Sequence, residues 1–321
     1  MKLLKVLSLL AMTAVIAGCG DNGEEKSQYS GNANKNIDRY AGLEFPHISS
    51  GNSSVVTHST PEYGITYSLE WDHTRKAQRW TCYYFTKQNK VKNGNRNNWR
   101  GGINWDGKSW NGDPFQKDPK IPYAEQPNVT GEFSGSSYPD KGFTYFQRGH
   151  ICASEDRVAS MDANGQTFYM SNMFPQGDKF NTGIWSTMES FVRNDWGRNI
   201  TGANDTLFVV KGGTIDHEDQ ILCRTKSGFI VPRYFFMALL LKRNGSYQAM
   251  GFWIEHTNES RANAKLSDYL VNIRTLEEKT KSRTGRNDGI DFFCNLPDDI
   301  ENAVETQDIA TIKRLWNLSN K

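Results

Sequence analysis

The first eighteen residues limit the part of this 321-residue chain that can fold as a globular domain. Lys2 and Lys5 give a positive start, and residues 3–16 form a nearly continuous apolar run that ends in small residues before Cys19. This run is shorter than the roughly 20 residues of a membrane-spanning helix, and its flanks are typical of a cleaved secretory signal. We therefore expect residues 1–18 to be absent from the mature protein.

The residues around Cys19 indicate how the mature chain is attached to the membrane. The order Val15-Ile16-Ala17-Gly18-Cys19 resembles a bacterial lipoprotein cleavage box, in which the cysteine becomes the lipidated N-terminus. An ordinary cleaved signal is the alternative interpretation. Both place the protein outside the cytoplasm. The lipoprotein interpretation predicts a cell-envelope protein anchored to the outer membrane through lipid on Cys19, either periplasmic or surface-exposed.

The segment that follows Cys19 differs in composition from the rest of the chain. Residues 19–36 are mostly Gly, Asn, Ser, Glu and Lys, which cannot bury enough apolar surface to fold, so we expect a flexible tether. No internal repeat and no later low-complexity stretch divides the remainder. With 37% hydrophobic and 12% aromatic residues, the chain has enough apolar material for a packed core. Residues 37–321 are predicted to form a single domain.

The net charge of the chain does not indicate which kind of molecule it binds. Lys2 and Lys5 account for the formal net charge of +2, so attraction to phosphate must come from local clusters. Residues 87–100 contain five basic residues and no acid, and Arg96 and Arg100 are our candidates for phosphate contacts. A solvated loop is the alternative.

The four cysteines after the tether, Cys82, Cys152, Cys223 and Cys294, form no CxxC pair, so the spacing of a zinc finger is absent. The sequence does not distinguish between disulfide bonds and buried free thiols for these four cysteines.

Hydrophobic patterning predicts a mixed α+β fold, with a mixed or antiparallel central sheet and flanking helices. The segments rich in β-branched and aromatic residues, expected to be strands, are residues 65–69, 80–86, 206–211 and 234–242. Residues 93–122 are dense in Gly, Asn, Asp and Pro, which favours a surface loop. Helical spacing of apolar residues predicts helices over residues 184–196 and 260–276.

Candidate catalytic residues occur in a fixed order in the middle of the chain. A hydrolase of phosphodiesters needs a base for water, an oxygen ligand for a hard cation, and positive charge near the phosphate. His150, Asn181 and Arg148 can fill these roles. His150 alone is weak evidence, because a lone histidine in a strand-like segment is more often structural.

The ordered set resembles the DNA/RNA non-specific endonucleases of the ββα-metal, or His-Me finger, superfamily. The features that carry the resemblance are Arg148-Gly149-His150, residues 169–176, Asn181 followed by Gly183, Glu189 inside a Trp-bearing helix, and the C-terminal segments 289–293 and 296–299. The likeness extends from about residue 55 to residue 304. It implies a secreted hydrolase that binds DNA and RNA through the backbone and cuts both. The sequence does not indicate an oligomeric state.

Within this resemblance, His150 is expected to be the general base and Asn181 a direct metal ligand through its side-chain oxygen. At about 1.5 Å per residue the backbones of Asn181 and Glu189 lie roughly 12 Å apart, so Glu189 is expected to reach the metal through water. Arg148 would stabilise charge on the phosphate, and Asn172 would shape the site. One neutral protein ligand suits Mg²⁺ better than zinc, with Mn²⁺ or another divalent ion as the alternative.

Each of these residues also has a simpler interpretation. Asn181 can cap a helix N-terminus, Glu189 can be a solvated helix residue, and Asn172 can form a turn. The sequence also departs from the family pattern at Gln147, where an acid is frequent, and in lacking the upstream arginine, whose place falls near Asp113.

Two other functions compete with the nuclease interpretation. Nine Trp and thirteen Tyr would suit a lipid-anchored surface protein that binds glycans, although aromatic residues in such numbers are more often core. A degenerate nuclease fold that binds without cleaving is the second. A binding module has no need of the combination of His150, Asn181 and Glu189.

Overall fold

The computed structural model describes residues 42, 45–49, 51–94, 96, 114–135, 142–143, 145–261, 263–281, 289–319 and 321. The expected signal, the tether with Cys19, and Arg100 lie outside these residues. Within the described part, no helix is both long and apolar enough to cross a membrane.

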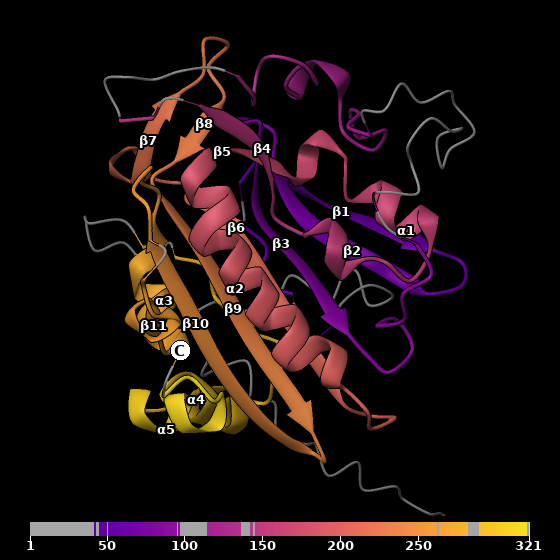
Figure 1. Ribbon diagram of the computed structural model, residues 1–321, viewed down its shortest axis with the longest axis vertical. Coiled ribbons are helices and arrows are strands. Elements are labelled where there is room, and N and C mark those ends of the chain that lie inside the picture. The colour runs from indigo at the N-terminus through magenta and orange to yellow at the C-terminus, as the bar shows by residue number, and fades with distance from the viewer. Residues whose placement is uncertain are drawn as a thin grey trace, which may run out of the picture.

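A seven-stranded antiparallel sheet forms the centre of the molecule, as expected for the α+β fold (Figure 1). In spatial order its strands are β1 (Ser53–Thr60), β2 (Gly64–Asp72), β3 (Ala77–Phe85), β6 (Thr206–Gly213), β9 (Tyr234–Arg243), β10 (Ser246–Glu255) and β11 (Leu270–Val271). The four segments predicted as strands fall in β2, β3, β6 and β9, which confirms them. The chain between β3 and β6 leaves the sheet and carries the candidate site.

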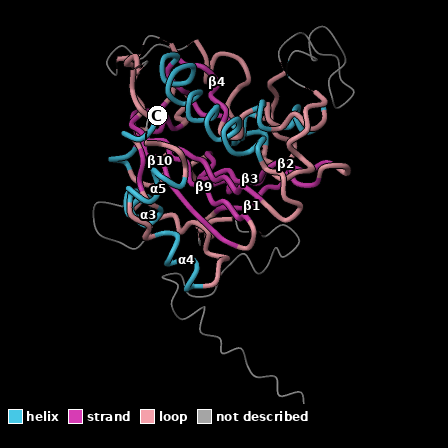
Figure 2. Tube along the Cα trace, turned by 60° about the horizontal axis from the view of Figure 1, so that its bottom comes forward, coloured by secondary structure: helices cyan, strands magenta, loops and turns pink. Residues whose placement is uncertain are grey.

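Both faces of the sheet are covered. In β9, Phe235, Met237 and Leu239 pack into one apolar cluster, and Phe236, Ala238 and Leu240 pack into another on the opposite face. Because successive side chains in a strand point to opposite faces, a strand buried on both sides is continuously apolar. Figure 2 shows helices above and below the strands.

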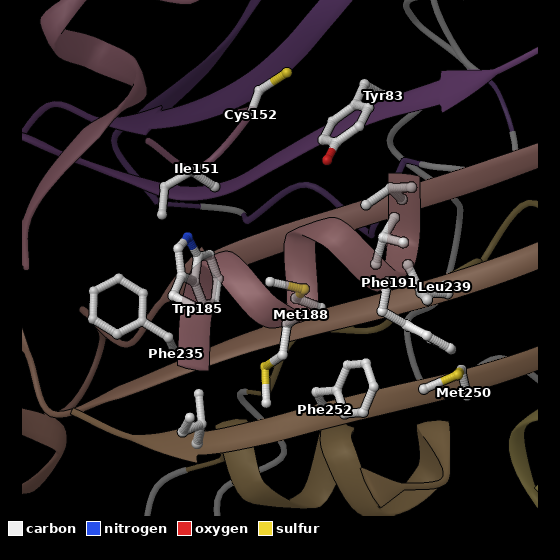
Figure 3. Close-up of a cluster of buried hydrophobic side chains, with 14 of the residues drawn as sticks. Tyr83, Ile151, Cys152, Trp185, Met188, Phe191, Phe235, Leu239, Met250 and Phe252 are labelled. Atoms are coloured by element: carbon white, nitrogen blue, oxygen red, sulfur yellow. The ribbon is translucent and has the colours of Figure 1, made fainter. Parts of the chain in front are cut away.

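One face is covered by a helical segment over residues 180–196 that is kinked at Gly183, where φ and ψ are non-helical. It comprises π-helical turns at Phe180–Trp185, α2 at Ser186–Ser190 and further π-helical turns at Phe191–Trp196, which confirms the predicted helix. Trp185, Met188 and Phe191 extend from this helix toward Phe235 and Phe252 of the sheet (Figure 3). The helix is thereby held rigidly against the strands.

Shorter elements complete the fold. They are β4 (Phe146–His150), α1 (Met161–Gln166), β5 (Met173–Gly177), β7 (Ile221–Arg224), β8 (Ile230–Pro232), α3 (Ile273–Thr280), α4 (Asp298–Glu305) and α5 (Ile309–Leu315). Side chains of α3 and α4 pack into the cluster on the sheet face opposite α2. The strands β4 and β5 pair antiparallel and are joined by residues 151–172, which include α1; this two-stranded unit is called the β4–β5 hairpin below.

The helix predicted over residues 260–276 is wrong in its first half. Residues Leu266–Asp268 form a 3₁₀ turn, and Leu270 pairs with Phe252 in the sheet. The helix α3 begins only after Asn272, whose side-chain oxygen accepts the Thr275 N–H at 2.8 Å. The apolar spacing at the start of the segment therefore reflects burial of a turn and a short strand.

Within the predicted loop of residues 93–122, the described residues form no strand beyond an isolated bridge between Gln116 and Tyr169. Much of that loop lies outside the described residues.

Candidate active site

The strand β4 carries two of the candidate residues, Arg148 and His150, and its pairing with β5 explains the glycine between them. A Cβ atom at Gly149 would lie 2.5 Å from Cγ of Gln176, a fully buried side chain of β5. Any larger residue would require the buried side chain of Gln176 or the strand that carries it to move. Gly149 therefore permits the close approach that places Arg148 and His150 beside the helix.

His150 stands at the end of β4 in an apolar setting. Its ring lies 5.1 Å from Phe168 and 5.6 Å from Phe115, measured between ring centroids. Its Nε2 atom is buried and has no hydrogen-bond partner among the described residues. Burial, followed by the positive charges of Arg96, Arg148 and Lys211, lowers the pKa of His150 to about 3. The imidazole is therefore neutral at physiological pH, which is the form that a general base requires.

The start of the helix is joined to β4 through two contacts. Trp185 Nε1 donates to the His150 carbonyl at 3.1 Å, and Asn181 Nδ2 donates to Gln147 Oε1 at 2.6 Å. The second contact orients the Asn181 amide so that Oδ1 faces away from Gln147. Asn181 lies in the turn ahead of the kink at Gly183, and its side chain accepts no helix N–H among the described residues, so the capping alternative is wrong.

The orientation of Asn181 bears on a metal ion. The donor side of its amide is occupied, and Oδ1 has no hydrogen-bond donor among the residues that the structure describes. A neutral amide oxygen is a suitable ligand for a hard cation such as Mg²⁺. The residues present therefore fit a divalent ion held by one protein oxygen.

Glu189 lies mostly buried, two turns along the helix. Its Oε1 is 3.3 Å from Lys211 Nζ, and Lys211 also lies 3.7 Å from Asp156 Oδ2. Burial raises the pKa of Glu189, and the ammonium of Lys211 opposes that rise. The alternative of a solvated helix residue is wrong, because the carboxylate belongs to a buried charged network.

Two members of this network were missed at the sequence level. Asp156 accepts hydrogen bonds from Arg193 at 2.8 Å and Tyr83 at 2.6 Å. Lys211 is fully buried in β6, where its neighbours in sequence are apolar or Gly. A lysine inside a buried strand was an available signal, since charged residues are rarely buried unless paired.

The candidate arginines lie against aromatic rings beside His150. Arg148 Nη1 donates to the Val129 carbonyl at 3.1 Å, and its guanidinium carbon is 3.7 Å from the centroid of Phe115. The guanidinium of Arg96 is 5.6 Å from the same ring and 5.5 Å from Phe168. Positive charge is thus concentrated near the histidine.

The side chain of Asn172 forms hydrogen bonds with the backbone of neighbouring segments. Its side chain accepts from Cys152 N and donates to the carbonyls of Cys152 and Thr167, all at 2.8 Å. These bonds hold the segment that follows His150, and they occupy both the oxygen and the nitrogen of the amide. Asn172 is therefore placed to position the histidine.

The hairpin β4–β5 followed by a helix brings a neutral histidine, an amide oxygen and two arginines together. This arrangement defines a ββα-metal nuclease fold. The sequence model of the DNA/RNA non-specific endonuclease family matches residues 47–299. The chain belongs to this family, whose members are hydrolases.

Similar proteins agree with this assignment. The mitochondrial nuclease EXOG of Xenopus laevis is 25% identical over 73% of this chain, which spans 58% of that relative's length. Nuclease C1 of Cunninghamella echinulata var. echinulata is 25% identical, with 72% of this chain and 81% of the relative covered. A nuclease of Nostoc sp. is 22% identical over 81% of this chain and 85% of its own length.

The fold also matches a solved structure of an EndoG/EndoGI complex. The TM-score is 0.53 at 19% identity, with 75% of this chain and 86% of the solved chain covered. At this identity the match supports the fold alone.

Proposed function

We propose that this protein is a metal-dependent endonuclease that hydrolyses phosphodiester bonds of both DNA and RNA with little base preference. The observation that carries the proposal is the pair formed by neutral His150 and the oriented amide of Asn181 on adjacent elements. Family membership supports the same activity.

In this proposal His150 accepts the proton of the attacking water. The positive charges that depress its pKa are the charges that a bound phosphate would neutralise. Substrate binding therefore raises the proton affinity of the imidazole at the step that needs it. Arg148 and Arg96 stabilise the negative charge on the phosphate.

Asn181 would hold Mg²⁺ or Mn²⁺ through Oδ1, and the bound ion would supply charge neutralisation at the phosphate. Glu189 would orient water of the ion with the carboxylate oxygen that Lys211 does not hold. Lys211 holds the other oxygen in place and opposes the rise that burial gives to the pKa of Glu189.

We further propose that the mature chain begins at Cys19 and is lipid-anchored to the outer membrane. Cys19→Ser would then release the protein from membrane fractions, whereas Ser27→Ala in the tether would not. Equal membrane retention of both variants would contradict the anchor.

The nuclease proposal is tested with purified residues 20–321, plasmid DNA and a structured RNA in Mg²⁺. Wild type should cut both substrates, and His150→Ala should lose about 10²- to 10⁴-fold in rate. Asn181→Ala should need far more Mg²⁺, whereas Asn194→Ala, an exposed residue of the same helix, should behave as wild type.

Wild-type cleavage no faster than His150→Ala across common divalent ions would exclude the activity and favour a binding protein on the same fold. Backbone recognition also predicts affinity that falls steeply with salt. Strong sequence preference among the cut sites would contradict that recognition.

A further inference from the structure

Three buried carboxylates meet on the side of the sheet opposite the helix that carries Asn181. Glu277 belongs to α3, Glu305 ends α4, and Asp291 lies in the segment between them. Oxygens of the three groups all lie within 4.8 Å of one another, and the residues are only 1%, 1% and 5% exposed. The proposed nuclease mechanism uses none of them.

The charge of this cluster is incompletely balanced. Arg274 lies 2.7 Å from Glu305 Oε2 and 3.5 Å from Glu277 Oε2. Lys281 pairs with Glu278 at 2.6 Å. Among the described residues, Arg274 is the one cation in ion-pair contact with these carboxylates, and Lys281 acts on Asp291 only from a greater distance. If all three carboxyls are ionised, the described ion pairs leave an excess of two negative charges in a buried location, where uncompensated charge is costly.

The hydrogen bonding of the cluster is also incomplete. Glu277 Oε1 accepts the Phe292 N–H at 3.0 Å. In contrast, Asp291 Oδ2 and Glu305 Oε1 are buried without a hydrogen-bond donor in the described part of the chain, and the only side-chain hydrogen bond of Asp291 there is with Glu277, another member of the cluster. Buried polar atoms almost always have a partner, so these oxygens indicate a ligand that the described residues do not supply.

We propose that Glu277, Asp291 and Glu305 bind one calcium ion at a site separate from the catalytic centre. Calcium takes oxygen ligands at about 2.3 to 2.6 Å, so two oxygens on one ion lie no more than about 5 Å apart. The cluster meets this limit. A double positive charge also equals the excess left by Arg274. Magnesium fits less well, because it demands near-octahedral geometry and retains water.

The ion would join α3, the Asp291 segment and α4, which pack on the same face of the sheet. Its role is therefore structural. Without it, burial and the charge of Glu305 raise the pKa of Asp291 to about 7, and burial raises that of Glu305 to about 7. Protons shared among these carboxyl groups are therefore the alternative to a bound ion as a means of relieving their mutual repulsion. Glu301 is a further carboxyl group nearby.

The test uses the full chain carrying Asn181→Ala, so that the proposed catalytic ligand is absent and the result is independent of the nuclease proposal. After removal of metal with EDTA, calorimetric titration with CaCl₂ at pH 7.5 should show one bound ion. At about 100 times Kd the melting temperature should rise by roughly 5–10 °C.

Adding Asp291→Asn should abolish both effects, and the amide keeps an oxygen and a donor beside Glu277, its hydrogen-bond partner among the described residues. Glu305→Gln is the second variant. Asp299→Asn, an exposed residue of α4, should keep both effects. Two results would overturn the proposal. The first is that CaCl₂ neither binds nor shifts the melting temperature at any pH between 6 and 9, which is the result expected if shared protons relieve the repulsion. The second is that calcium binding survives Asp291→Asn and Glu305→Gln.

Discussion

At the residue scale, Gln147 shows how the site tolerates a departure from the family pattern. The frequent acid is replaced by an amide, and that amide accepts a hydrogen bond from Asn181. The contact needs an oxygen acceptor at this position and does not need a negative charge. Gln147 thus orients the proposed metal ligand.

We predict that Gln147→Ala raises the Mg²⁺ concentration for half-maximal cleavage by about 10- to 100-fold, the usual effect of removing a partner that orients a ligand. Gln147→Glu retains an acceptor oxygen and should stay within a few-fold of wild type. The measurement is a Mg²⁺ titration of initial cleavage rates. An unchanged midpoint in Gln147→Ala would show that Asn181 is oriented by other contacts.

His150 predicts an unusual pH dependence. Its pKa is lowered to about 3, so the free enzyme keeps a neutral base well below the ordinary value of about 6.5. The ratio kcat/KM, which reports the free enzyme, should therefore show no loss from this histidine between pH 7.5 and pH 5.5. Arg96→Gln removes one depressing charge and should move any acid limb upward. An acid limb near pH 6.5 in wild type would contradict this environment for His150.

The order of His150, Asn181 and Glu189 predicted a candidate site only together with the resemblance to the endonuclease family, because each of these residues alone also has a simpler interpretation. Lys211 and Asp156 could not be connected to it in the same way. They are far apart in the chain, and only the packing of β6 against the helix brings them to Glu189.

At the scale of elements, the packing of the β4–β5 hairpin depends on the absence of a side chain at Gly149. Gly149→Ala would place Cβ against the buried side chain of Gln176. Overpacking of this kind costs about 1–3 kcal/mol and displaces His150. Both the free energy of unfolding and the cleavage rate should fall. The double variant Gly149→Ala with Gln176→Ala removes the clash and should recover part of both, measured by urea unfolding and plasmid cleavage. No recovery would mean that Gly149 is needed for another reason.

The strands and the long helix could be predicted wherever one pattern of apolar residues extended over the whole element. The four predicted strands are central and β-branched or aromatic, and the helix over residues 184–196 keeps one apolar side against the sheet. Residues 260–276 failed because their apolar residues are shared among a turn, a strand and a helix. The pairing of Leu270 with Phe252 is a long-range contact that helical spacing cannot reveal.

At the scale of the whole molecule, His256 connects the β4–β5 hairpin, which carries the candidate site, to the rest of the fold. Its Nε2 accepts the Gly177 N–H of β5 at 2.9 Å, and Nδ1 donates to the Pro232 carbonyl of β8 at 3.0 Å. Aromatic rings surround it, with Phe143 at 4.7 Å and Phe180 at 4.8 Å between centroids. Both nitrogens serve these contacts only while the ring is neutral.

Burial lowers the pKa of His256 to about 3, against about 6.5 in an unfolded chain. Between these values the unfolded chain binds a proton that the folded protein does not. Stability from this residue is therefore complete above pH 6.5 and falls on acidification, at about 1.4 kcal/mol per pH unit. From pH 7.5 to pH 5 the loss is about 2 kcal/mol. In urea unfolding, His256→Gln should be less stable at pH 7.5 yet lose about 2 kcal/mol less than wild type over this range. Because His150 remains in both proteins, its contribution cancels in the comparison, and equal losses would show that His256 does not set the acid stability of the fold.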